Sequence, residues 1–442
     1  MLAWARCQKG GNHVLRDVLL QIPVAQSMIT LDILLHDSAE EVHAMTAISI
    51  CPNIYWIGVN DRTTDLFEGL WPIDQTGVSY NAYLIRDQKT ALIDLAKSFK
   101  AEEFLSQIAQ LADLGTIDYI VINHMEPDHS SLLSLFRRLA PRAVLLGTEK
   151  AVEMLAAYYG ITENVQVVKD GETLSLGDHT LQFVSAPFVH WPETMMTYET
   201  KERVLFSCDA FGGYGALRGA IFDDECVDMR YYEQEALRYY ANIVAKFSGP
   251  VLKAIKKLEG VPVEVIAPSH GLVWRKNPKQ IVELYAKWAR YAAEPAEVGV
   301  TLVYGSMYGN TERMMNSVAQ GISSEDVSLE VFDAARAHAS YILPSLWMKK
   351  GVMIGAPTYE VELFPPVAHV LDMAARKRIL NKKAAWFGSY GWSGGAQREI
   401  ETIIQPLKWE MVETFEFRGG PTAEDLRAAH EFGARFARTL KG

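Results

Sequence analysis

One short segment concentrates four side chains that can bind a metal ion. Residues 123–129 read Asn-His-Met-Glu-Pro-Asp-His and follow the β-branched run 118–122, so they stand where a predicted strand passes into a loop. The donors are His124, Glu126, Asp128 and His129. Alternate side chains of an extended segment point the same way, so the first three can line one side while His129 begins a helix. Without a cation, their mutual repulsion and desolvation would be unfavourable, and the segment therefore predicts a metal site.

Three further donors occur downstream, at His190, Asp209 and His270. The last two each follow an apolar strand-like run, where a loop would project them at one end of a sheet. Taken singly, a buried Asp or His more often satisfies a backbone group. Together with the first segment, however, they give four histidines and three carboxylates, enough for two metal ions. A nitrogen and oxygen set without thiolate favours iron, manganese or zinc. Nearby Trp191 and Tyr198 could support the donors or be core aromatics.

A second group of loops has the chemistry of a phosphate and flat-ring site. Residues 305–311 read Gly-Ser-Met-Tyr-Gly-Asn-Thr between a predicted strand, Thr301–Tyr304, and a predicted helix, Thr311–Ile322. The segment matches neither the G-x-G-x-x-G fingerprint nor a Walker loop. Backbone N–H groups, the hydroxyls of Ser306 and Thr311 and the Asn310 amide could surround a phosphate at the helix N-terminus.

Two later loops, Gly355–Tyr359 and Gly388–Gly395, follow the predicted strands Gly351–Ile354 and Ala384–Phe387. Loops at strand carboxyl ends are where doubly wound sheets bind ligands. Their glycines let backbone approach a flat ring, on which aromatic side chains could stack. Alone, the 388–395 loop could also be a mobile turn.

The three loops in this order resemble a flavodoxin. The resemblance implies FMN, with its phosphate on 306–311 and its isoalloxazine between the other two loops. The residues expected to contact FMN are Ser306, Met307, Tyr308, Gly309, Asn310, Thr311, Pro357, Thr358, Tyr359, Ser389, Tyr390, Gly391, Trp392, Gly394 and Gly395.

The metal pattern, H-x-E-x-D-H followed by His190, Asp209 and His270, resembles the flavodiiron proteins. Their first domain has the metallo-β-lactamase fold, whose zinc hydrolases carry H-x-H-x-D-H. Here Glu126 stands at the second His position, which favours iron. The resemblance implies two iron ions per chain. One would be held by His124, Glu126 and His190, and the other by Asp128, His129 and His270, with Asp209 bridging them.

The 442 residues are too many for one ordinary core. We predict an α/β protein with an extension of unknown role at 1–46. Residues 47–295 would form a metallo-β-lactamase-like αββα sandwich, and residues 299–442 a flavodoxin-like doubly wound parallel sheet. Expected elements include a hairpin of Asn81–Arg86 with Ala91–Leu95, helices at Ser130–Leu139 and Pro278–Ala292, and a linker at Glu294–Gly299.

Composition excludes several classes. A net charge of -11 disfavours a nucleic-acid binder, and no apolar run of about 18 residues predicts a membrane span. Residues 1–45 lack a signal-peptide layout, because Asp17, Gln21 and Asp32 interrupt any apolar core. The four cysteines form no C-x-x-C pair, which argues against a disulfide framework and against a rubredoxin-type site. We expect a cytoplasmic protein.

The resemblance implies an oxidoreductase that passes electrons from FMN to a non-haem di-iron centre and reduces dioxygen to water, nitric oxide to nitrous oxide, or both. It also implies a head-to-tail homodimer, or a dimer of dimers, in which the FMN of one subunit serves the iron of the other. The electron donor would be separate, such as a rubredoxin or a reduced deazaflavin. Two alternatives are a zinc-dependent hydrolase fused to a flavodoxin module, and an electron carrier whose first domain is a docking scaffold. The sequence does not distinguish the two gases.

Overall fold

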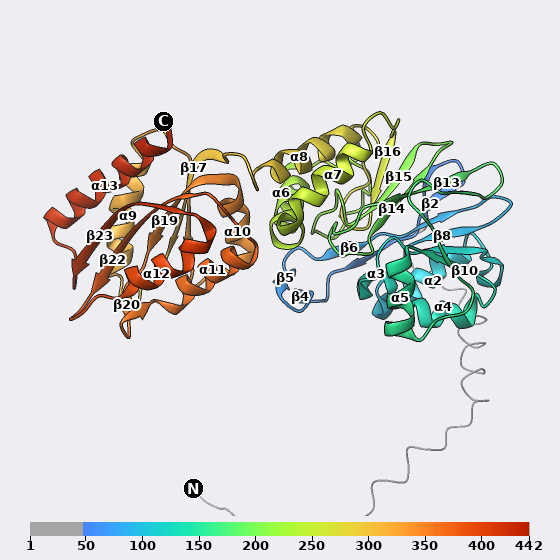
Figure 1. The fold of residues 1–442 in the computed structure, drawn as a ribbon, viewed down its shortest axis with the longest axis horizontal. Coiled ribbons are helices and arrows are strands. Elements are labelled where there is room, and N and C mark those ends of the chain that lie inside the picture. Colours follow the sequence, from blue (N-terminus) through green and yellow to red (C-terminus); the bar gives the residue numbers. More distant parts are fainter. Residues whose placement is uncertain (1–46, 442) are drawn as a thin grey trace, which may run out of the picture. The chain divides into compact units, whose positions relative to one another are not determined.

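The computed structural model describes residues 47–441 (Figure 1). The predicted extension at 1–46 lies outside the described residues. Within the described part, no helix is long and apolar enough to cross a membrane.

Two sheets build the first part of the chain. The larger has the order β1-β2-β7-β8-β9-β10-β11 and the smaller the order β12-β13-β14-β15-β16. The strands of the first are β1 (Ile48–Cys51), β2 (Ile54–Trp56), β7 (Tyr83–Ile85), β8 (Ala91–Ile93), β9 (Tyr119–Val121), β10 (Val144–Gly147) and β11 (Val165–Val167). Those of the second are β12 (Thr173–Ser175), β13 (Thr180–Ser185), β14 (Met195–Glu199), β15 (Val204–Cys208) and β16 (Val265–Pro268). The predicted hairpin is confirmed as the antiparallel pair β7 and β8.

Helices flank the two sheets, with α2, α4 and α5 beside the first and α6, α7 and α8 beside the second (Figure 1). Their bounds are α2 (Ala101–Ala109), α3 (Pro127–Ser130), α4 (Leu133–Leu139), α5 (Glu149–Tyr159), α6 (Met229–Tyr239), α7 (Ser248–Lys257) and α8 (Pro278–Arg290). In α8, Pro278 occupies the first turn and Ile281, Tyr285 and Trp288 form one buried stripe at helical spacing. The prediction of one helix over Ser130–Leu139 was wrong at its start, because α3 ends at Ser130 and α4 begins at Leu133.

A third sheet has the order β18-β17-β19-β22-β23, and every neighbouring pair in it is parallel. Its strands are β17 (Glu297–Tyr304), β18 (Leu329–Asp333), β19 (Lys349–Gly355), β22 (Lys383–Tyr390) and β23 (Glu410–Arg418). The helices between and after them are α9 (Asn310–Ser323), α10 (Ala339–Met348), α11 (Pro365–Arg376), α12 (Ala396–Ile404) and α13 (Ala423–Lys441). This strand order is that of a doubly wound flavodoxin-like sheet. The predicted fold class is confirmed.

Two predicted boundaries differ from the structure. Strand β17 begins at Glu297, which pairs with Lys349, so the second half of the predicted linker Glu294–Gly299 is strand. Strand β22 continues to Tyr390, which pairs with Arg418, so the predicted loop at Gly388 begins three residues later. In both places backbone pairing with a neighbouring strand extends the element beyond its apolar run.

The buried apolar cluster of the first two sheets continues into α10. The indole Nε1 of Trp347 donates to the carbonyl of Trp288, at 2.9 Å, and its ring lies 6.1 Å from that of Tyr240. A buried lysine, Lys382, donates to the carbonyls of Trp347 and Lys349 at the end of the same helix, at 2.9 and 2.7 Å. The third sheet is therefore joined to the first part by shared core.

Candidate metal centre and flavin loops

The metal loop runs from the end of β9 into α3. Its backbone is fixed by buried carboxylates: Asp94 accepts from the N–H and the amide of Asn123, at 2.8 and 3.0 Å. Glu193 accepts from the N–H of Met125 at 2.9 Å. The Ser130 hydroxyl donates to the carbonyl of Met125 at 2.7 Å. The loop is therefore preorganised by the protein.

The other donors emerge from the second sheet. Strands β15 and β16 are parallel and paired, with Phe206 opposite Ala267, so Asp209 and His270 leave the same end of the sheet. This is the placement that the sequence predicted. His190 lies in the turn between β13 and β14.

All seven predicted donors are buried and lie in two groups, within each of which the ligand atoms are no more than 4.8 Å apart. One group is His124, Glu126, His190 and Asp209, and the other is Asp128, His129 and His270. The division matches the one that the flavodiiron resemblance implies.

Asp209 faces both groups, one oxygen to each. Its Oδ2 lies 3.1 Å from Nε2 of His190 and 3.4 Å from Nε2 of His124. Its Oδ1 lies 3.1 Å from Nε2 of His129 and 3.4 Å from Nε2 of His270. A carboxylate turned in this way can bridge two metal ions.

Each group also has a carboxylate of its own. Glu126 Oε2 lies 3.2 Å from Nε2 of His124 and 3.1 Å from Nε2 of His190. Asp128 Oδ2 lies 3.4 Å from Nε2 of both His129 and His270. Each half thus offers two imidazole nitrogens, its own carboxylate and one oxygen of Asp209.

Several buried polar atoms at the centre lack hydrogen-bond partners, as expected for atoms that bind metal ions. Within the described chain, both carboxylate oxygens of Asp128 and Asp209 and Nε2 of His129, His190 and His270 are buried without a hydrogen-bond partner. Buried polar atoms are rarely left so, and seven such atoms on five side chains in one place are explained by a shared cation pair. The residues present therefore fit two metal ions of the iron, manganese or zinc type.

Electrostatics agrees with the hydrogen bonding. Burial opposes the charged imidazoles, but Asp209 and Glu126 outweigh it and raise the pKa of His190 to about 9. Asp128 and Asp209 likewise raise the pKa of His270 to about 10 against its burial. Burial alone would raise the pKa of Asp209, yet His129, His190 and His270 hold it well below its usual range. The carboxylates therefore favour positive charge here, which protons supply when metal does not.

Two supporting groups were missed by sequence reasoning. Nδ1 of His124 lies 2.7 Å from Oε1 of Glu193, and Nδ1 of His270 lies 2.7 Å from the Ser79 carbonyl. A histidine that binds metal through Nε2 carries its proton on Nδ1, and these acceptors fix that tautomer and the ring orientation. The only available signal was that Glu193 follows His190 by three residues, whereas a backbone carbonyl leaves no mark in a sequence.

The two neighbouring aromatics have different roles. The ring of Trp191 lies 5.1 Å from that of His124, edge to face. The hydroxyl of Tyr198 instead donates to the Pro262 carbonyl at 2.6 Å, so this residue is a core aromatic.

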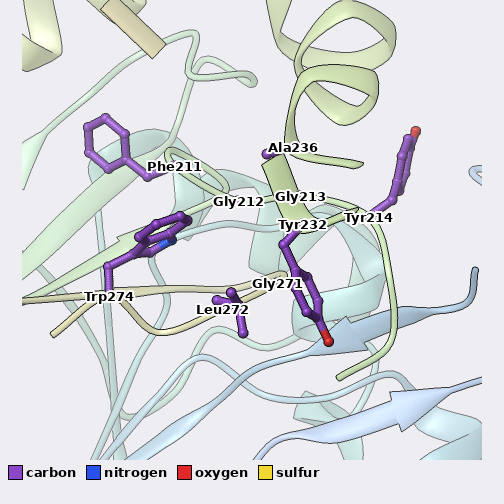
Figure 2. A pocket seen from close by; sticks show the side chains of 9 residues that line it. All are labelled: Phe211, Gly212, Gly213, Tyr214, Tyr232, Ala236, Gly271, Leu272 and Trp274. Atoms are coloured by element: carbon purple, nitrogen blue, oxygen red, sulfur yellow. The ribbon is translucent and has the colours of Figure 1, made fainter. Parts of the chain in front are cut away.

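A small cavity lies behind two of the donors. Figure 2 shows its lining, which comes from the segments that follow Asp209 and His270 and from α6: Phe211, Gly212, Gly213, Tyr214, Tyr232, Ala236, Gly271, Leu272 and Trp274. A Cβ at Gly213 would lie 2.8 Å from Cα of Ala236, so the close approach of α6 requires glycine there. The volume of about 10 Å³ has room for about one water molecule.

The three predicted flavin loops lie at the carboxyl ends of β17, β19 and β22. The first and third meet, because Oγ1 of Thr311 lies 3.2 Å from Oγ of Ser389. Ser306 accepts from the N–H of Gly309, whose φ of 86° favours glycine before α9. In the second loop, Thr358 and Tyr359 form strand β20, paired with β21 (Glu362–Leu363).

Several side chains of these loops are exposed and make few contacts with the rest of the protein. Tyr308 and Trp392 are 91% and 86% exposed, and Met307 and Tyr359 are 41% and 40% exposed. Oγ1 of Thr358 is buried and has no hydrogen-bond partner in the described chain. A Cβ at Gly395 would lie 1.9 Å from the Val361 carbonyl, so the third loop approaches the turn between β20 and β21 this closely only because residue 395 is glycine. Exposed rings beside neutral donors fit a flavin phosphate and its flat ring.

Comparison with known proteins extends over both parts. Residues 78–271 match the family described as ODP family beta lactamase, and residues 302–433 match flavodoxin. The chain is 39% identical over 398 residues to the anaerobic nitric oxide reductase flavorubredoxin of Escherichia coli K12, with 89% of this chain and 82% of that protein covered.

Two solved structures are similar along almost their whole length. The rubredoxin oxygen:oxidoreductase of Desulfovibrio gigas has a TM-score of 0.85 and 30% identity, with 90% of this chain and 99% of that chain covered. The flavodiiron protein of Giardia intestinalis has a TM-score of 0.84 and 30% identity, covering 90% and 97%.

Proposed function

This chain belongs to the flavodiiron proteins, and from that premise we propose that it binds one FMN and two iron ions and couples them in the reduction of nitric oxide, dioxygen or both. It is a nitric oxide or oxygen reductase of that family. We assign residues 47–295 to the metal-binding domain and 299–442 to the flavin-binding domain.

The orientation of the Asp209 carboxylate is the main observation that supports this proposal. Its two oxygens face two separate donor groups, at 3.1 Å from His190 and 3.1 Å from His129, as a bridging carboxylate requires. Two metal ions held by these residues would supply electrons for the reduction of a diatomic gas, and FMN when bound would replace those electrons.

The protein residues prepare the site for that chemistry. Three carboxylates favour the more oxidised metal that remains after electrons leave. Glu193 and the Ser79 carbonyl hold two imidazoles in the metal-binding tautomer. The hydrolase alternative gives no use to the flavodoxin-like sheet, and it expects histidine where Glu126 stands.

Metal and flavin content test the proposal most directly. We expect about one FMN and two iron ions per chain in protein produced with iron and zinc both available. Turnover with each gas under a controlled reductant then shows which is preferred. If the protein instead contains two zinc ions and reduces neither gas, the result would support the alternative hypothesis of a zinc-dependent hydrolase.

A separate electron donor is part of the proposal. The four cysteines of this sequence form no C-x-x-C pair, which is the pattern of a rubredoxin-type iron site. We propose a rubredoxin or a reduced deazaflavin as donor, to be distinguished by the rate at which each reduces the bound flavin.

We also propose that the working unit is a head-to-tail dimer, alone or paired into a dimer of dimers. Exposed apolar side chains occur beside both centres: Tyr308 and Trp392 on the flavin loops, and Leu66, Leu70 and Phe188 around the metal centre. Each set could cover the other in a symmetric pair, which would bring the flavin of one subunit to the metals of its partner.

Subunit mixing tests this arrangement. An Asp209→Ala chain lacks a working metal centre and a Thr311→Glu chain lacks a working phosphate loop, so each alone is expected to be inactive. Their hybrids should regain activity, since one flavin-to-metal route is intact. The matched control mixes Asp209→Ala with the double variant, which restores no route. Hybrids verified to hold their intact cofactors yet inactive would exclude transfer between subunits.

A further inference from the structure

The hairpin of β4 (Leu66–Phe67) and β5 (Trp71–Pro72) lies against both halves of the metal centre. The ring of Phe67 meets that of His270 edge to face, with centroids 5.5 Å apart. The carboxyl of Glu68 lies beside that of Glu126, and its Oε2 accepts from Nε1 of Trp71 at 3.0 Å. Two successive residues of one hairpin thus touch one ligand of each metal group.

The hairpin has little support of its own. It is a two-stranded sheet with two residues in each strand. Its turn contains Glu68 and Gly69, both at positive φ, and Leu66 and Leu70 are 42% and 43% exposed. An isolated hairpin of this size is at best marginally stable in water. Its position must therefore be fixed by what packs against it.

Trp71 makes the contacts that fix it, and two of them come from the flavodoxin-like region. The indole is fully buried. Nζ of Lys377, which follows α11, lies 4.7 Å above its ring, and the ring of His338 meets it edge to face at 6.5 Å.

A second tie holds the end of the hairpin. The guanidinium of Arg238 donates to the Pro72 carbonyl at 2.9 Å and to the Ser340 hydroxyl at 3.0 Å. Ser340 belongs to α10. Both ties join the hairpin to the flavodoxin-like region of the same chain.

We propose that Trp71 and Lys377 are positioning residues through which the flavodoxin-like region presses the β4–β5 hairpin onto the metal ligands and so fixes the space in which the gas is bound. The inference rests on the proposed function, because it takes the ligands to hold the catalytic metals. Without the cation above Trp71, the hairpin loosens, Phe67 and Glu68 withdraw from His270 and Glu126, and metal and gas are both held less tightly.

The test uses full-length protein loaded with FMN and metal. In Lys377→Met the rate at which a chelator removes metal should rise about tenfold, as expected for a desolvated cation–π contact. The KM for nitric oxide should rise with it, while kcat per bound metal pair and FMN content stay within about twofold. Lys377→Arg keeps a cation over the ring and should behave like the parent protein.

Arg376→Met is the matched control, since Arg376 is the neighbouring cation and forms a surface ion pair with Asp372. Trp71→Phe keeps an aromatic ring for Lys377 but loses the hydrogen bond to Glu68, so an intermediate rate is expected. Parental metal release in Lys377→Met, or equal acceleration in Arg376→Met, overturns the proposal. If the purified protein holds zinc, the proposed function fails, but the release rates of that zinc still decide whether the hairpin is held as described.

Discussion

At the metal centre every donor is buried and held by the protein, whereas at the flavin loops two aromatic side chains, Tyr308 and Trp392, are 91% and 86% exposed. The difference follows from the ligands. A metal ion is small and bare, so the protein must supply its whole surroundings in advance. FMN brings its own large apolar surface, and the loops need only fix its phosphate and offer rings for it to cover. Substitutions at the first site should therefore lower metal content and activity, whereas those at the second should weaken flavin binding and leave the metal content unchanged.

The largest effect is expected from Asp209→Ala. Because its two oxygens face both donor groups, its loss should remove both metals and lower gas reduction by more than about 100-fold, beyond the range seen for outer hydrogen-bonding partners. Glu126→Ala should mainly weaken one metal. Metal analysis per chain checks both. Full retention of two metals in Asp209→Ala would contradict the assignment of Asp209 as a ligand shared by both metal ions.

Metal removal should make stability depend on pH in a defined direction. In the metal-free protein the pKa of His190 is raised from 6.5 to about 9 and that of His270 to about 10. These groups therefore stabilise the metal-free fold fully below pH 6.5 and lose that contribution as the pH rises through about 9 to 10. The loss should be on the order of a few kcal/mol.

Thermal unfolding of chelated and metal-loaded protein between pH 6 and 10 measures this effect. Metal ions replace the protons, so the loaded protein should lack the decline, and the difference between the two forms cancels other titrating groups. Parallel curves for both forms would mean that the donors are not charged as described.

A smaller effect is expected from Glu193→Gln. The amide still can accept from Nδ1 of His124 but no longer offers a charge, so metal affinity should fall by about 10-fold, the lower end for such partners. Competition with a chelator measures it. Glu264→Gln, at an exposed carboxylate paired with Arg203, is the control and should change nothing.

The smallest effect is expected at the flavin loops. Trp392→Ala and Tyr359→Ala should each weaken FMN by about 0.5–1.5 kcal/mol beyond the area lost, which is about a 2- to 12-fold change in Kd. Iron content should stay the same. Titration of FMN into flavin-free protein, followed by fluorescence, measures the affinity. Loss of iron with unchanged flavin affinity would reverse the assignment of the two sites.

The sequence was most informative where potential metal-binding side chains stand at the ends of predicted strands. Asp209 and His270 were predicted as donors because each follows a short apolar strand, and the parallel pairing of β15 and β16 places them at the same end of the sheet. The other donors were predicted from the cluster at 124–129 and from the spacing to His190. The β4–β5 hairpin was not found, because Leu66, Glu68 and Trp71 have no alternation or spacing that distinguishes them from any polar turn. Its role depends on Lys377, which is distant in the chain, and on hydrogen bonds that only the folded protein forms.

The shared core at Trp347 and Trp288 has a consequence for building chimeras. A flavodoxin-like module is often thought of as a cassette that can be moved between proteins. Cutting this chain before β17 would leave α10 with an uncovered indole and the carbonyl of Trp288 without its donor. A transplanted module would therefore require its new partner to carry an equivalent of α8, and a flavodoxin spliced in its place would have to present a tryptophan at the same turn of its own helix.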